Sequence, residues 1–271
     1  MGMLIYDALV LARVAQSASR KARVLTLGVP TLNFRDADYQ RASGDHTARF
    51  SDHKSFFHHL GFADVDSLDV SDYEGANIVG DLNDPHLAER IPHSYDLIYD
   101  SGTLEHIFEA PTALRTLSGL TAPGGAVVHA TPTNGFMDHG FWQVSPDLFR
   151  SFYPAEGFSI LTSALFVLGR YPFALPADRN IYRTHGRSFI VANIPEAVAV
   201  FAARKNRDVE RTRVGLQDYY RQMHEGGTGD TPPDFFLQHG SALKARIGRS
   251  LPGRWLLGTL QWARHVLRKV L

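Results

Sequence analysis

The sequence predicts an α/β protein built on a doubly wound, mostly parallel sheet. Short apolar runs alternate along the chain with longer amphipathic stretches, a pattern typical of strands joined by helical crossovers. The chain has 271 residues, of which 44% are hydrophobic, enough for one large domain with an appendage. We therefore expect a Rossmann-like domain with an N-terminal helix over residues 1–195, followed by a C-terminal helical extension over residues 196–271.

Seven strands account for the short apolar runs, at residues 22–29, 64–71, 76–83, 94–102, 125–132, 158–169 and 187–195. Apolar residues at helical spacing predict helices near the N-terminus, over 46–62 and over 109–120. Ser145 is expected to cap a further helix, with Pro146 at its first position. Residues 168–180 read as a proline-rich loop, and beyond residue 196 the chain reads as helical and charged.

Composition and charge limit the class of protein. The chain has no cysteine, which excludes disulfides and thiolate–metal sites. The net charge is zero, but the last acidic residue is Asp234 and seven lysines and arginines follow it. Asp7 and Arg13 interrupt the apolar N-terminus, which favours an amphipathic helix over a signal peptide. No stretch approaches the length of an apolar membrane-spanning helix.

Polar residues follow four of the predicted strands. Gly28 ends the first strand, and polar residues end the next four: Asp69 the second, Asp81 with Leu82 the third, Asp100-Ser101-Gly102 the fourth, and Thr131-Pro132-Thr133-Asn134 the fifth. In a doubly wound sheet these carboxyl ends share the edge where ligands bind. Asp69 is placed to accept the ribose hydroxyls of a nucleoside, and Asp81 the amino group of adenine. The alternative is that each aspartate only starts a turn.

The segment "YDLIYDSGTLEHI" (95–107), followed by "GLTAPGGAVVHATP" (119–132), resembles the class I S-adenosylmethionine-dependent methyltransferases. The strand, the Glu105-His106 pair and the Pro123-Gly124-Gly125 turn match that pattern in order. The resemblance covers about residues 20–195. It implies S-adenosyl-L-methionine as cofactor, held by Gly28, Asp69, Asp81, Leu82, Gly102 and Glu105.

The first glycine motif departs from the family. Where the family has an acid followed by Gly-x-Gly-x-Gly, this chain has Thr26, then Gly28, Pro30 and Leu32. Proline fixes φ and lacks an N–H, so the backbone path at Pro30 must differ from the family's path. Either the loop follows another route and still binds the cofactor, or the chain is a non-catalytic relative. A dinucleotide dehydrogenase is disfavoured, because it needs three glycines after this strand.

Two histidines are candidates for acceptor chemistry. His139 lies in a segment after the fifth strand, where the resembled family commonly binds its acceptor, and His106 follows Glu105. A neutral imidazole can remove a proton from an acceptor hydroxyl near neutral pH. The alternative for His139 is a structural role in the loop. We expect no metal site, including at the adjacent pair His58 and His59.

The C-terminal stretch 250–271 is amphipathic. Leucines recur at helical spacing beside two tryptophans and a basic face, a pattern typical of helices that lie in a membrane interface. Packing on the protein's own core, or on a second copy in a homodimer, is the alternative; nucleic acid is not expected. The sequence thus predicts a cytoplasmic methyltransferase that O-methylates a small molecule, a sugar or a lipid-linked glycan. If the tail binds membrane, the enzyme is peripheral at the inner membrane face. The alternative is a membrane-attached, non-catalytic scaffold.

Overall fold

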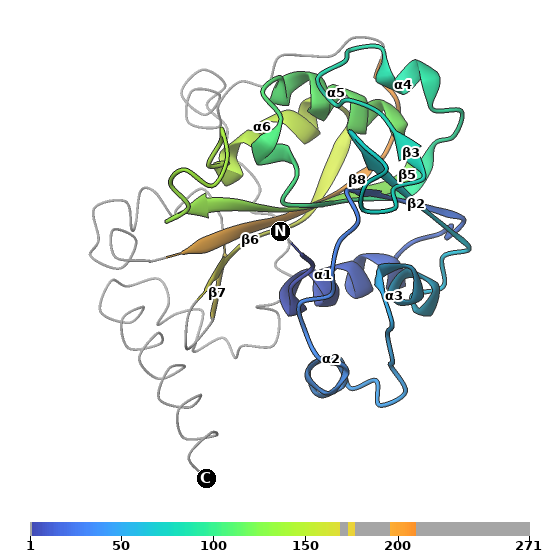
Figure 1. The fold of residues 1–271 in the computed structure, drawn as a ribbon, viewed down its shortest axis with the longest axis vertical. Helices are drawn as coiled ribbons and strands as arrows, with labels where there is room; N and C mark the ends of the chain where they lie inside the picture. Colours follow the sequence, from blue (N-terminus) through green and yellow to red (C-terminus); the bar gives the residue numbers. More distant parts are fainter. Residues whose placement is uncertain (1, 169–172, 177–195, 210–271) are drawn as a thin grey trace.

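The computed structural model describes residues 2–168, 173–176 and 196–209, and its centre is one mixed sheet (Figure 1). Over these residues the strand order is β3-β2-β1-β4-β5-β8-β6-β7. The first five strands in chain order are mutually parallel, and β8 pairs antiparallel with β5 and β6. The predicted α/β class with a doubly wound, mostly parallel sheet is confirmed. The strands are β1 Arg23–Leu27, β2 Asp64–Asp69, β3 Ile78–Val79, β4 Tyr95–Ser101, β5 Thr121–Asn134, β6 Phe158–Val167, β7 Phe173–Pro176 and β8 Ala197–Lys205.

Helices cover both faces of the sheet (Figure 1). One face carries α1 Ile5–Gln16 and α3 His53–His59, with α2 Asp36–Ser43 beyond them. The other face carries α4 Leu87–Arg90, α5 Ala110–Leu120 and α6 Pro146–Ala155. The 3-10 helix η1 Leu104–His106 follows β4 at the end of the sheet.

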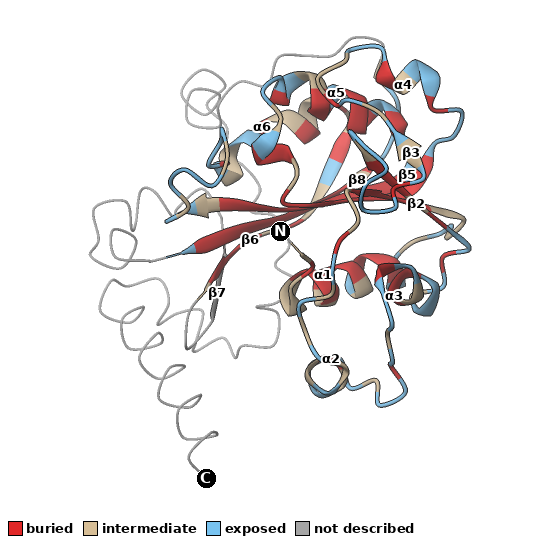
Figure 2. Ribbon diagram, in the orientation of Figure 1, coloured by how far each residue is buried: buried red, intermediate tan, exposed pale blue. Residues whose placement is uncertain are grey.

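The central strand β4 is buried on both of its faces. All seven of its residues are buried, and the central strands of the sheet are drawn mostly in red in Figure 2. Successive side chains point to opposite faces of a strand. Leu97 and Tyr99 therefore join the core beneath α1 and α3, while Ile98 joins the core beneath α5 and α6. The run "YDLIY", apolar apart from Asp96, suits a strand buried on both sides.

Two helix starts follow directly from their sequences. Ser145 caps α6 by accepting a hydrogen bond from Asp147 N–H at 3.3 Å, and Pro146 occupies the first helical position, as predicted. Asp52 caps α3, accepting from Ser55 N–H at 2.7 Å. The helix predicted over 46–62 is therefore shorter and begins only after this cap.

The end of the sheet differs from the sequence-based expectation. The stretch Ala197–Lys205, expected to be helical, is strand β8 and is almost wholly buried between β5 and β6. The sheet therefore continues past the predicted boundary at residue 195. Strand β7 lies within the predicted proline-rich loop and brings the described strands to eight.

Two other predictions lie outside the described residues: the strand over 187–195 and the amphipathic tail over 250–271. Among the helices that the structure describes, none has the length and apolar character needed to cross a membrane.

Candidate functional site

The carboxyl ends of three strands meet at one edge of the sheet. Leu27, the last residue of β1, pairs with Leu68 of β2 and with Asp100 of β4. The residues that follow these pairs, Gly28 and Asp69 among them, therefore lie side by side. Strand order reverses between β1 and β4, and such a switch point is where open α/β sheets bind ligands.

Gly28 forms the close approach at this edge. Its φ is +71°, a left-handed conformation that glycine adopts without steric cost. Its N–H donates to the Leu68 carbonyl at 2.7 Å. A Cβ placed on Gly28 would lie 3.6 Å from Asp69 Oδ2 and 3.7 Å from Thr103 Oγ1. The ends of β1 and β2 and the turn after β4 thus converge around Gly28.

The loop after Gly28 takes a route that differs from a plain strand–glycine–helix turn. Pro30 is buried, and the chain then runs alongside the N-terminal segment, where Leu32 forms a parallel bridge with Met3. Met3 N–H donates to the Thr31 carbonyl at 2.8 Å, and Asn33 N–H donates to the Met3 carbonyl at 2.8 Å. Helix α2 begins only at Asp36. The altered glycine motif is therefore an ordered loop held by the N-terminus.

Thr26 stands where the resembled family carries an acid. Its side chain is fully buried, and its hydroxyl lies 2.8 Å from both the Gly28 carbonyl and Ser67 Oγ. His53 Nε2 lies 3.2 Å from the same Ser67 hydroxyl. Thr26, Ser67 and His53 thus form a small polar group that holds the Gly28 carbonyl, and its role is structural.

Asp81 and Leu82 take local roles at the third strand end. Asp81 Oδ1 accepts hydrogen bonds from the backbone and the side-chain amide of Asn83, at 2.8 and 2.7 Å, which is the turn-starting arrangement weighed from the sequence. The Leu82 side chain is buried in the core, so it can offer a ligand only its backbone. Gly80 N–H donates to the Asp69 carbonyl at 2.8 Å, which ties this turn to the end of β2.

A buried polar chain fixes the turn after β4. Asp100 Oδ1 accepts from the N–H groups of Thr103 and Leu104, and Oδ2 lies 2.8 Å from His129 Nδ1. His129 Nε2 lies 2.6 Å from the Tyr153 hydroxyl, and all three side chains are fully buried. These hydrogen bonds hold Gly102, whose φ is +75°, in place at the carboxyl ends of the strands. Sequence reasoning missed it; the available signal was a histidine inside the apolar run "GAVVHATP".

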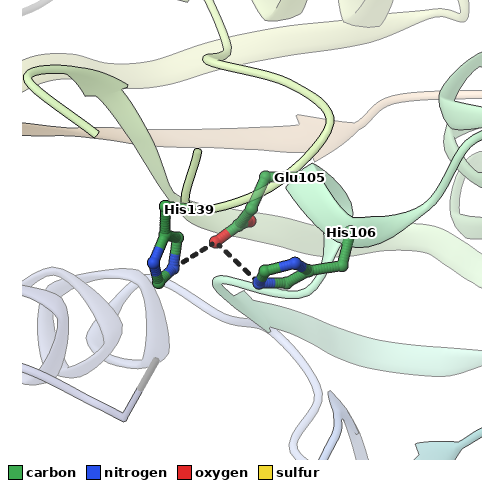
Figure 3. A group of neighbouring side chains, drawn as sticks. All are labelled: Glu105, His106 and His139. Carbon is green, nitrogen blue, oxygen red and sulfur yellow. Dashed lines mark ion pairs between the residues drawn. The ribbon is translucent and has the colours of Figure 1, made fainter. Parts of the chain in front are cut away.

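Glu105, His106 and His139 form a second cluster beside this edge, drawn in Figure 3. Glu105 Oε1 lies 3.8 Å from His106 Nε2 and 3.8 Å from His139 Nε2. Glu105 is fully buried, and burial, reinforced by the nearby Asp100 charge, raises its pKa to about 8. Burial, and then the neighbouring His139, lowers the pKa of His106. The sequence expected Glu105 to face the cofactor, whereas its side chain points between the two histidines.

The loop after β5 brings His139 to this position. Asp138 has φ +64°, and His139 N–H donates to the Phe136 carbonyl at 3.1 Å, which forms a tight turn. Trp142 then anchors the loop on η1, since its backbone N–H donates to the Glu105 carbonyl and its indole N–H to the Ile107 carbonyl.

This anchored loop leaves apolar side chains at the surface. Phe108 and Phe141 are both exposed and meet edge-on, with ring centroids 5.8 Å apart. Each lies two residues from one of the paired histidines, His106 and His139. An apolar surface therefore adjoins the histidine cluster.

Comparisons with known proteins give fold-level likenesses only. No protein-family model and no curated protein sequence matches the chain. Among solved structures, TehB from Haemophilus influenzae is 14% identical with a TM-score of 0.41, over 74% of this chain and 62% of TehB. The N-methyltransferase NodS from Bradyrhizobium japonicum, solved with S-adenosyl-L-homocysteine, is 12% identical with a TM-score of 0.43, over 74% of this chain and 87% of NodS.

A further solved structure, a SAM-dependent methyltransferase from Archaeoglobus fulgidus, is 13% identical with a TM-score of 0.44, over 73% of this chain and 93% of that one. The chain spans less than two thirds of TehB, the first of these relatives. At these identities and TM-scores none of the likenesses carries an argument about activity. The strand order itself, with an antiparallel strand beside β5 after a run of parallel strands, is consistent with the class I methyltransferase-like fold that the sequence predicted.

Proposed function

We propose that the chain is an S-adenosyl-L-methionine-dependent methyltransferase. One observation carries the proposal: at the switch point between β1 and β4, Gly28 in a left-handed conformation lies against the Asp69 carboxylate. A bare backbone allows a ligand to approach closely, and a carboxylate beside it can accept two hydroxyls. This combination suits the ribose and the methionine portion of that cofactor.

The residues around this pair fit the rest of the cofactor. Val70, Tyr73 and Val79 follow β2 or end β3 and expose large apolar surfaces, with Tyr73 91% exposed. A planar base can pack against such surfaces, while Asp81 offers a carboxylate to an exocyclic amine and Leu82 its backbone. Because Pro30 has no N–H, the methionine end would be held at Gly28 and at the Gly102 turn.

The cofactor, when bound, supplies a methyl group carried on a sulfonium, and transfer to a nucleophile depends mainly on positioning the two reactants. We propose an acceptor hydroxyl on a small molecule, a sugar or a lipid-linked glycan. Exposed Phe108 and Phe141 support this choice, because aromatic faces pack well on sugar rings and apolar chains. His106 or His139, when neutral, can accept the proton of that hydroxyl.

We also propose that residues 250–271 attach the protein to an anionic membrane surface. The support is their composition alone: leucines, two tryptophans and basic residues, with no acidic residue after Asp234. A cytoplasmic enzyme so attached would meet a lipid-linked acceptor at the inner membrane face. The same tail on a chain without cofactor binding would make the protein a scaffold, which is the alternative function.

Calorimetric titration with S-adenosylhomocysteine tests the proposal. We expect the wild-type chain to bind it, and Asp69→Ala to weaken binding about tenfold or more, because a hydrogen bond to a charged group contributes roughly 1.5–3 kcal/mol. Asp64→Ala is the matched control, since Asp64 lies at the opposite end of the same strand. Absence of binding by the wild-type chain would overturn the proposal and favour the scaffold.

A further inference from the structure

The buried carboxylate of Glu105 lacks the partners that such a group normally has. Neither of its oxygens has a hydrogen-bond partner among the described residues, and the side chain is fully buried. Buried charges are as a rule paired or bound to a metal. In the part of the chain that the structure describes, only His106 and His139 bring a basic group within 4 Å of it, each at 3.8 Å, too long for a hydrogen bond.

The two histidines face this carboxylate with their Nε2 atoms (Figure 3). Their rings are 5.2 Å apart between centroids and inclined at 56°, so they converge without stacking. One ligand atom from each of the three residues lies within 4.8 Å of the others. Glu105 and His106 are neighbours on η1, and His139 comes from the loop that Trp142 anchors on the same element.

We propose that Glu105, His106 and His139 bind a divalent transition-metal ion. Two imidazole nitrogens and one carboxylate oxygen are a donor set that suits zinc, manganese, iron or cobalt. Bonds of about 2.0–2.2 Å place ligand atoms roughly 3–3.5 Å apart, so side-chain rotations that close the group by about 1 Å would complete the site. The ion would supply both Glu105 oxygens with the positive partner that they lack.

The position of the site suggests a role. The two histidine side chains remain 47% and 39% exposed, so a bound ion would keep coordination positions open to the outside. Phe108 and Phe141, whose exposed rings meet edge-on, each lie two residues along the chain from one of these histidines. An oxygen ligand from an acceptor could occupy one of the open coordination positions, where the ion would favour loss of the hydroxyl proton. With the ion bound, His106 and His139 would act as its ligands instead of as proton acceptors. This role rests on the proposed methyl transfer, whereas metal binding itself does not.

Metal binding can be measured without cofactor or activity. The full-length, tag-free chain is stripped with chelator and titrated calorimetrically with Co²⁺ and with Zn²⁺, and the visible absorption of bound Co²⁺ is recorded. We expect one equivalent to bind, with ligand-field bands of nitrogen–oxygen coordination. His139→Gln should weaken metal binding by at least about tenfold, because it removes a direct ligand. Even the loss of a residue that only hydrogen-bonds to a metal ligand typically weakens binding about 10- to 100-fold.

The matched control is His86→Gln. His86 Nδ1 lies 3.1 Å from Glu89 Oε1, closer than either cluster histidine lies to Glu105, but the pair is exposed and no third ligand group joins it among the described residues. This variant should bind as the wild type does. Glu105→Gln and His106→Gln should weaken metal binding in the same way, and His106→Gln serves as the test if Glu105→Gln does not fold. Wild-type binding no stronger than that of His139→Gln, or an equal loss in His86→Gln, would overturn the inference.

The two proposals can fail separately. S-adenosylhomocysteine binding is measured in the presence of chelator, and metal binding in the absence of that ligand. Ligand binding without a specific metal site would remove the inference and leave the proposed function. A specific metal site without binding of S-adenosylhomocysteine would remove the proposed function and leave the inferred metal site.

Discussion

Asp7 offers a direct test of how burial controls the stability of this fold. It lies in the first turn of α1 with only 1% of its surface exposed. Its Oδ2 accepts hydrogen bonds from Leu4 N–H at 2.8 Å and from the Tyr99 hydroxyl at 3.1 Å, while Oδ1 is buried without a partner in the described structure. Burial raises the pKa of Asp7 from 3.8 to about 7. Asp7→Asn keeps the shape and removes the charge.

The sign of the effect follows from proton binding. Between pH 4 and pH 7 folded Asp7 holds a proton that the unfolded chain has released, so the free energy of unfolding falls as pH rises through this window. At about 1.4 kcal/mol for each pKa unit, the loss reaches roughly 4 kcal/mol above pH 7. Asp7→Asn lacks this loss. The variant should therefore gain stability over the wild type with rising pH, by up to about that amount.

Urea unfolding followed by tryptophan fluorescence at pH 5, 6, 7 and 8 measures this difference. Asp72→Asn, at an exposed position, is the control and should give a curve parallel to that of the wild type. A constant gap between Asp7→Asn and the wild type at every pH would refute the reasoning, because it would mean that Asp7 is charged at little cost in the folded chain.

Three further outcomes are expected. Gly28→Ala should lower the free energy of unfolding by about 1–2 kcal/mol, because φ there is +71°, whereas Gly119→Ala on α5 meets open space and should not. Tyr153→Phe should cost about 1–3 kcal/mol in the same assay by leaving His129 Nε2 buried and unpaired, whereas Tyr73→Phe at an exposed site should be neutral. Deletion of residues 250–271 should abolish flotation with anionic vesicles; equal flotation of the shortened chain would contradict the proposed attachment.

Much of the sheet could be predicted because its signals are local. Strand Arg23–Leu27 lies in a short apolar run, and the cap at Ser145 needs only its immediate neighbours. Ala197–Lys205 was assigned wrongly for the same reason. Its alanines are good helix formers in isolation. The segment becomes a strand because it pairs with β5 on one side and β6 on the other.

The candidate site divides in the same way. Gly28 and Asp69 could be brought together from sequence, because the carboxyl ends of neighbouring parallel strands share an edge. The chain from Asp100 through His129 to Tyr153 could not, since it depends on the register of β4 and β5 and on how α6 packs. The sequence also suggested no metal ligand set, because His139 meets Glu105 only through the turn at Asp138.

By itself the sequence determined the α/β class, the order of the first five strands along the chain and the kinds of group at each strand end. Those features depend on hydrophobic period and turn chemistry, which act over a few residues. Only the tertiary structure decided the route of the loop at Pro30, the burial of Glu105 and its meeting with two histidines. Such features depend on contacts between residues far apart in the chain, and these contacts cannot be derived from local sequence patterns.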